Sequence, residues 1–272
     1  PLLKGKRGEF NALAELSQKV KPLITPFIDV QRVSRNDDEG IDVHLLKIVN
    51  NLKISWGTEN PIFIDLADID LTQRTVDGTH PVNYLFGLLR TASIRAIPCT
   101  GLDRDTDYND AIAKVLKEDN GGVCVRVLYD DMDNIKELSD ILSDLFKALA
   151  IPHKDVHLLL DFKDIRNSDI AKLARKVIRI IDQLHKIALW RTLTIAASGF
   201  PDSLSSVKAD FTTEINRIEF LLWRAIITDK TLKRRPSFGD YGVVHPILLD
   251  LDPRTMRSSA KIRYTLNDKW LV

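Results

Sequence analysis

The sequence predicts an α/β protein built as a (β/α)8 TIM-like barrel. Short apolar runs alternate with longer segments of helical periodicity along almost the whole chain, which is the pattern of repeated strand and helix units. Eight apolar runs with seven helical segments between them match the number of units in such a barrel. The runs are continuously apolar, as expected for parallel strands covered on both faces. An open doubly wound α/β sheet would use the same units without closing the ring, and it is the alternative.

Each unit has its own local signals. The predicted strands are residues 2–6, 23–29, 62–66, 94–99, 122–128, 156–161, 193–198 and 237–244. The predicted helices are residues 9–20, a segment starting near 41, and residues 81–91, 109–118, 132–149, 168–187 and 213–228. In order along the chain, Pro22 ends the first helix, Leu45 to Leu52 give the second its apolar face, and Pro81 opens the third in a tolerated first-turn position. Ser168 is the predicted N-cap of the sixth helix.

The end of the chain departs from this repeat. Residues 257–272 are predicted to form a C-terminal β extension of a single α/β barrel domain that spans residues 1–272, and they stop abruptly at an apolar residue. We therefore expect the C-terminus to be truncated.

Composition limits the classes of partner. The 272 residues are 28% charged but carry a formal net charge of only +1, so no global field attracts nucleic acid or an anionic membrane. No apolar stretch approaches the length needed to span a bilayer. Cys99 and Cys124 lie in apolar runs, which suits a reducing compartment. We predict a soluble, cytoplasmic protein that has no nucleic-acid partner and no membrane association.

Charged and polar side chains gather at the predicted carboxyl ends of the strands, where barrels and doubly wound sheets bind ligands. Asp65 and Asp161 end apolar runs and Arg126 interrupts one, which is costly unless each charge is paired. The polar residues at strand ends also include Asp29, and Asp68, Asp164 and Ser198, which we interpret as helix N-caps or first-turn residues. The candidate site residues from this reasoning are Lys6, Arg7, Glu9, Asp65, Arg126, Asp161, Lys163, Asp240 and Tyr241.

Two interpretations of these residues remain open. In the first, the basic side chains Lys6, Arg126 and Lys163 bind a phosphate or carboxylate group of a ligand. The neighbouring acids then act as an acid–base pair or bind Mg²⁺, which is the only cofactor that the sequence suggests. The same residues would also form an internal salt-bridge ring that seals the barrel. Sequence motifs do not decide, because the chain has no Walker loop, dinucleotide fingerprint, His-Glu-x-x-His or Gly-x-Ser-x-Gly elbow.

An ordered series of segments then resembles a known family. The segments are residues 3–10, 24–26, 63–66, 159–162, 217–219 with 222–223, 239–241 and 262–265. Together they resemble the beta protein family found in bacteriophages, satellite prophages and bacterial genomes. The resemblance implies a setting among mobile elements and phage-defence loci, and no particular reaction. It also adds Arg217 and Glu219 to the site, with Glu219 expected to point at the mouth and Arg217 to anchor the loop.

Two functions follow. In the first, the chain is a hydrolase or phosphodiesterase for an anionic, nucleotide-like substrate. Its catalytic residues would be Glu9, Asp65, Asp161, Glu219 and Asp240, and its substrate-binding residues Lys6, Arg7, Arg126, Lys163, Arg217 and Tyr241. In the second, the barrel is a non-catalytic phage-defence or toxin-control module whose loops bind a protein partner.

Overall fold

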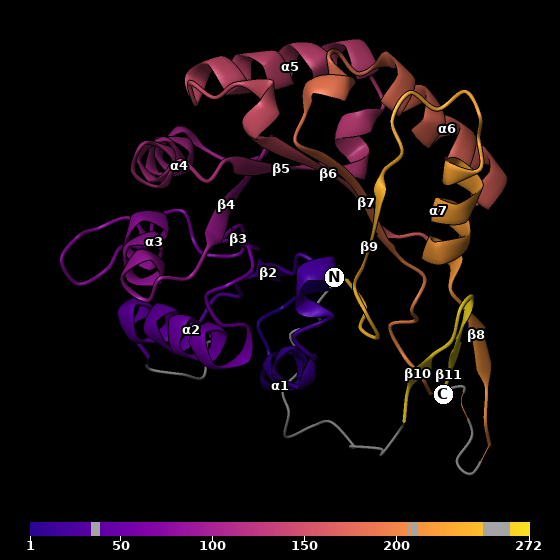
Figure 1. Ribbon diagram of the computed structural model, residues 1–272, viewed down its shortest axis with the longest axis horizontal. Coiled ribbons are helices and arrows are strands. Elements are labelled where there is room, and N and C mark those ends of the chain that lie inside the picture. The colour runs from indigo at the N-terminus through magenta and orange to yellow at the C-terminus, as the bar shows by residue number, and fades with distance from the viewer. Residues whose placement is uncertain (34–38, 206, 208–210, 247–261) are drawn as a thin grey trace.

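Eight parallel strands form a nearly closed barrel with helices on its outside (Figure 1). The computed structural model describes residues 1–33, 39–205, 207, 211–246 and 262–272. The barrel strands are β1 (Leu2–Leu3), β2 (Phe27–Asp29), β3 (Ile62–Asp65), β4 (Ala96–Gly101), β5 (Val123–Leu128), β6 (Val156–Asp164), β7 (Thr192–Ser198) and β9 (Ser237–Asp240). They neighbour one another in chain order from β1 to β9, and each printed pair is parallel. The predicted barrel is confirmed, and the open doubly wound order is not adopted.

The helices form an outer ring around the strands. They are α1 (Arg7–Glu15), α2 (Ile41–Ser55), α3 (Pro81–Thr91), α4 (Thr106–Asp119), α5 (Ile135–Ala148), α6 (Ile170–Gln183) and α7 (Ile218–Ile227). Their apolar faces and the outward side chains of the strands make the main core, in which Leu45, Leu85 and Val177 are fully buried. Asp169 caps α6 by accepting a hydrogen bond from the Lys172 backbone, so the prediction of Ser168 as the cap was one residue early.

The predicted helix at residues 213–228 was wrong at its start. Residues Glu214–Asn216 form a short strand, β8, and α7 begins only at Ile218. β8 pairs antiparallel with β11 (Lys269–Leu271), which also pairs with β10 (Tyr264–Thr265). This small sheet lies outside the barrel beside α7 (Figure 1). It accounts for the described part of the predicted C-terminal β extension, whereas residues 257–261 lie outside the described residues.

The barrel interior is layered because strand side chains alternate with a period of two. A middle layer of apolar side chains comes from Leu2, Phe27, Cys99, Cys124, Leu159, Ala196 and Tyr241, with Phe63 against them. Two residues further along, on the same inward face, β1 continues to Lys4, β2 to Asp29, β3 to Asp65, β5 to Arg126 and β6 to Asp161. The fold therefore delivers five charged side chains into the interior at the carboxyl ends of the strands, which we call the mouth.

Candidate functional site

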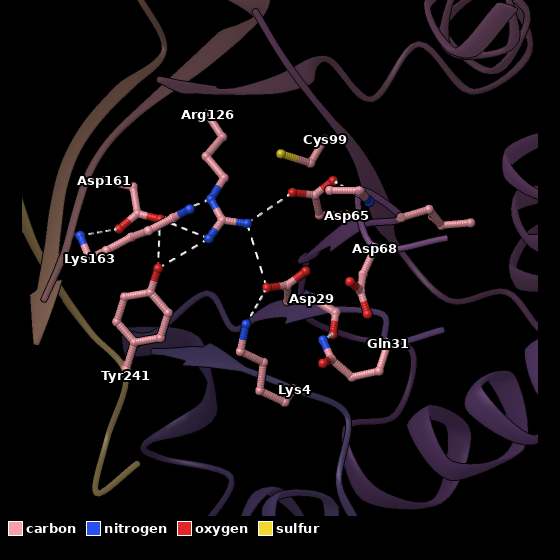
Figure 2. Close-up of polar contacts among 12 residues, drawn as sticks. Lys4, Asp29, Gln31, Asp65, Asp68, Cys99, Arg126, Asp161, Lys163 and Tyr241 are labelled. Carbon is pink, nitrogen blue, oxygen red and sulfur yellow. Dashed lines mark hydrogen bonds and ion pairs between the residues drawn. The ribbon is translucent and has the colours of Figure 1, made fainter. Parts of the chain in front are cut away.

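Arg126 is the centre of a charged cluster at the mouth (Figure 2). Its Nε and Nη2 donate to Oδ2 of Asp161 at 2.9 and 2.7 Å, and its Nη1 donates to Oδ2 of Asp65 at 3.1 Å. Nη1 also lies 3.6 Å from Oδ2 of Asp29. One guanidinium from β5 thus joins carboxylates from β2, β3 and β6, which lie far apart in the sequence.

Tyr241, just after β9, ties the last strand into the same cluster. Its hydroxyl donates to Oδ2 of Asp161 at 2.6 Å and accepts from Nη2 of Arg126 at 3.1 Å. Burial and the neighbouring Asp161 carboxylate raise the pKa of the Tyr241 phenol well above its usual value. Tyr241 therefore acts as a neutral donor to Asp161 at neutral pH.

Arg104 and Tyr108 pair with the other side of Asp65. Arg104 Nη2 lies 3.1 and 3.2 Å from the two oxygens of Asp65, and the Tyr108 hydroxyl lies 3.4 Å from Oδ1. Burial alone would raise the Asp65 pKa, but Arg104 and Arg126 more than offset it and hold the pKa below its usual value. Asp65 is therefore an ionised, fully enclosed carboxylate.

Lys4 and Asp29 form the outer edge of this arrangement. Lys4 Nζ donates to Oδ2 of Asp29 at 2.6 Å, and the two side chains keep 11% and 9% of their surface exposed. The side chains of Asp65 and Asp161 are fully buried. The central cluster, defined as Lys4, Asp29, Asp65, Arg104, Arg126, Asp161 and Tyr241, balances three cations with three carboxylates.

Arg217, Glu219 and Asp240 form a second group next to the mouth, which we call the Arg217 cluster. Arg217 Nε and Nη2 lie 3.2 Å from Glu219 and 3.2 Å from Asp240, and its Nη1 donates to the backbone carbonyls of Leu266 and Asn267. The two side chains meet although they are two residues apart, because Arg217 is the N-cap and precedes the helix. Arg217 links α7, β9 and the turn between β10 and β11.

Glu219 faces the end of β7. Its Oε2 accepts a hydrogen bond from the Gly199 backbone at 3.1 Å, and a Cβ at Gly199 would meet that oxygen at 3.0 Å. Burial raises the pKa of Glu219 to about 7, against the opposing effects of its own backbone N–H and of Arg217. Glu219 is thus a buried acid that titrates near neutrality.

The remaining predicted residues lie apart from both clusters. Glu9 Oε2 accepts from the backbone N–H groups of Lys4 and Lys6 at 2.9 Å each, so this acid closes the turn that begins α1. Lys6 and Arg7 are exposed. Lys163 has an exposed side chain, while its backbone, at φ 50°, donates to Oδ1 of Asp161 at 2.9 Å. Of the predicted residues, Asp65, Arg126, Asp161 and Tyr241 come together in the central cluster.

Sequence reasoning missed Lys4, Arg104 and Tyr108 and did not carry Asp29 into the site. The signal for Lys4 was its position two residues after Leu2, which places both on one face of β1. Gly5 then turns the chain at φ 66°, which takes Lys6 and Arg7 out of the barrel. Arg104 lies in the loop between β4 and α4 and carries no comparable signal.

The side chains at the mouth do not fit the Mg²⁺ ion that the sequence suggested as a cofactor. Within the residues that the structure describes, no group of three or more His, Cys, Asp and Glu side chains is arranged to hold a metal ion. The acids of the central cluster are instead each paired with Lys4, Arg104 or Arg126. No helix among the same residues is long and apolar enough to cross a membrane.

The fold and the mouth define a (β/α)8-type barrel protein with a charged cluster at the carboxyl ends of its strands. The family model described as "Beta protein" matches residues 1–272, and the chain belongs to this family. Among solved structures, the chain is similar to a triosephosphate isomerase from Bartonella henselae, with 10% identity and a TM-score of 0.43 over 88% of this chain and 90% of that one. No curated protein matches the chain.

Proposed function

We propose that this chain is a hydrolase of the phosphodiesterase type that acts on an anionic, nucleotide-like substrate at the mouth. The observation that carries the proposal is the state of Asp29. The Asp29 contacts with Lys4 and Arg126 both involve Oδ2, at the outer edge of the central cluster (Figure 2). No side-chain hydrogen bond to Oδ1 is found among the described residues, so this oxygen is available beside the Lys4 ammonium. An available carboxylate oxygen next to a cation is the pair that acid–base hydrolysis of an anion needs.

The deeper acids are poor candidates for direct chemistry. Asp161 accepts from Arg126 and Tyr241 on one oxygen and from the Lys163 backbone on the other. Asp65 is similarly occupied on both oxygens by Arg104 and Arg126. These two carboxylates have no exposed surface, so we assign them the role of holding Arg126, which in turn positions Asp29.

The proposed reaction divides between the two outer residues. Asp29 takes a proton from a water molecule, whose oxygen forms a bond to phosphorus as the phosphorus–oxygen bond to the leaving group breaks. The Lys4 ammonium balances the charge on the phosphoryl oxygens and gives a proton to the leaving oxygen. The ion pairs that hold Arg126 are buried, and buried ion pairs rarely stabilise a fold as well as apolar side chains would. Stability alone therefore does not account for these charges, which favours a role for them in the site.

A ligand screen tests the proposal. Purified protein is heated with nucleotides, cyclic nucleotides and phosphorylated metabolites, each with and without divalent metal, beside the variants Asp29→Asn and Asp133→Asn. Asp133 pairs with Lys176 on the surface and serves as the matched control. We expect a ligand to raise the melting temperature of the wild type and of Asp133→Asn but not of Asp29→Asn. Equal stabilisation of all three proteins contradicts a site at the mouth.

A second candidate function is the phage-defence or toxin-control module that binds a protein partner. The observation that favours it is the row of apolar side chains at and beside β10: Ile262, Tyr264 and Leu266 are 76%, 63% and 46% exposed. These exposed apolar side chains lie close together in the sequence, on and beside the edge strand of the small sheet. If Tyr264→Ser abolishes a partner's binding while Asp29→Asn has no effect, this second function replaces the first.

A further inference from the structure

Helix α6, on the outside of the barrel, concentrates positive charge on its exposed face (Figure 1). Between its N-cap Asp169 and Asp182 in its last turn, every charged residue is basic. Three of these cations, Lys172, Arg175 and Arg179, are exposed. Their spacing of three and four residues places them on one face of the helix. We call these three residues the α6 stripe.

The charge of the α6 stripe is not balanced by ion pairs. Within the described residues no ion pair is found for its three side chains, whereas the fourth cation of the helix, Lys176, pairs with Asp133. Asp133 and Asp169 line the same surface groove as Lys172 and Arg179, but both acids already have partners. Asp133 binds Lys176, and Asp169 accepts from the Lys172 backbone as the N-cap. The stripe therefore keeps its full positive charge towards solvent.

The loop between α7 and β9 adds further cations at the end of α6. Lys233 Nζ donates to the backbone carbonyl of Asp182, which places the loop next to the last turn of α6. Helices α6 and α7 are also neighbours in the outer ring (Figure 1). Lys230 and Arg235 in the same loop are exposed and have no ion pair among the described residues. The positive surface thus continues from α6 onto this loop.

The α6 stripe lacks the apolar and aromatic anchors of other interaction surfaces. None of the large apolar side chains of α6, all of whose residues the structure describes, is exposed. Tyr129 lines the groove, but Lys176 Nζ lies 4.1 Å from the centre of its ring, so this ring face is not open to a stacked base. Protein interfaces, membrane-binding helices and single-strand binders all rely on such anchors. Cations alone suit a phosphate backbone.

We propose that the α6 stripe and the adjoining loop bind double-stranded nucleic acid through its phosphates, without reading its sequence. A duplex carries one negative charge per about 1.7 Å of its axis, whereas cations on one helix face recur every 5–6 Å or so. A duplex therefore offers a phosphate to each cation of the stripe. The net charge of the whole chain predicted no nucleic-acid partner, and this surface is a local exception to that prediction. The site is independent of the function proposed for the mouth.

Fluorescence anisotropy of a labelled DNA duplex of mixed sequence measures the binding, in NaCl from about 50 to 200 mM. The wild type is compared with the stripe variant Lys172→Gln/Arg175→Gln/Arg179→Gln. Because these side chains are exposed and unpaired, and Gln is a good helix former, the variant should fold. We expect it to bind the duplex at least about tenfold more weakly than the wild type does. The slope of log K against log salt should become shallower by about 1 for each lost phosphate contact.

A matched control removes the same charge elsewhere. Lys53→Gln/Lys114→Gln/Lys117→Gln replaces three exposed cations of α2 and α4 that have no ion pair among the described residues. It should bind the duplex as the wild type does. Equal weakening of the stripe variant and this control would overturn the proposal, because net charge alone would then explain the binding.

Three further results bear on the proposal. The loop variant Lys230→Gln/Arg235→Gln should weaken binding less than the stripe variant does, and if only the loop variant weakened it, the assignment to α6 would be wrong. Absence of binding by the wild type at the lowest salt overturns the proposal. So does displacement of the duplex by an equal charge concentration of poly-L-glutamate, which would assign the surface to an acidic protein. Circular dichroism establishes that each variant is folded, and Arg175→Gln replaces the stripe variant if that one is not.

Discussion

Arg126 donates two hydrogen bonds to a single oxygen of Asp161, from Nε at 2.9 Å and from Nη2 at 2.7 Å. The same oxygen also accepts from the Tyr241 hydroxyl at 2.6 Å. Burial alone would lower the pKa of Arg126, but Asp161, Tyr241 and Asp65 more than offset it and raise the pKa above its usual value. Arg126 and Asp161 are joined in the barrel interior by these hydrogen bonds, and the other residues of the central cluster are arranged around the pair.

Removal of Arg126 should be strongly destabilising. Arg126→Met leaves Asp161 and much of Asp65 without their buried cation, and the expected loss is about 3–5 kcal/mol of unfolding free energy. Chemical denaturation measures it. Arg90→Met, which removes an exposed pair with Glu118 and Asp119, should cost under about 1 kcal/mol. Similar losses for the two variants would show that the central cluster is not a tightly paired network.

The Tyr241 hydroxyl should contribute less than the ionic pair. Tyr241→Phe keeps the ring in the middle layer but removes the donor to Asp161, and we expect a loss of about 1–2 kcal/mol in unfolding free energy. Tyr84→Phe is the matched control, because the Tyr84 hydroxyl has no hydrogen bond within the described residues. If Tyr241→Phe were as stable as the control, the hydroxyl would not be bonded as described.

Glu219 should make the protein less stable as the pH rises towards neutrality. Its pKa is raised from 4.5 to about 7 by burial, so between these values the folded chain binds more protons than the unfolded chain. The stabilisation is complete below about pH 4.5 and is lost as the pH rises through 7, by up to about 3 kcal/mol. Unfolding free energies measured from pH 4.5 to 8 should show this slope in the wild type and not in Glu219→Gln. Parallel pH profiles for the two proteins would rule out a raised pKa.

Gly122 should not tolerate a side chain. It has φ +87° at the start of β5, and a Cβ there would lie 2.4 Å from the backbone oxygen of Asp155. Gly57 has a similar φ of +84° with open space around it. We expect Gly122→Ala to lose at least about 3 kcal/mol and Gly57→Ala about 1 kcal/mol in denaturation experiments. Equal losses would mean that the contact with Asp155, which precedes β6, is looser than described.

The barrel could be predicted because its strands are continuous apolar runs. Residues 122–128 and 156–161 were predicted nearly as observed, since strands buried on both faces leave an unambiguous pattern. Residues 214–216 were predicted as helix because they adjoin α7 and carry no pattern of their own. They become a strand through pairing with β11, in which Glu214 lies opposite Leu271, 57 residues further along the chain. Local sequence does not encode such a partner.

The candidate site was predictable in part for the same reason. Asp65, Arg126 and Asp161 interrupt or end apolar runs, so their charges stood out before any geometry was known. Lys4 and Arg104 lie in short polar stretches where a charge is ordinary. Only the three-dimensional pairing distinguishes Lys4, which binds Asp29, from Lys6, which is exposed.

The most direct test of the proposed function is the rate of hydrolysis by Asp29→Asn for the ligand that the thermal screen identifies. The substitution removes the general base while leaving the Arg126–Asp161 pair intact, so we predict a fall in kcat of about 10²–10⁴-fold in a protein that still folds, with a lower melting temperature because Lys4 loses its carboxylate partner. Asp133→Asn should hydrolyse the ligand at the wild-type rate. Unchanged turnover by folded Asp29→Asn would contradict the proposal that Asp29 and Lys4 carry the chemistry of the mouth.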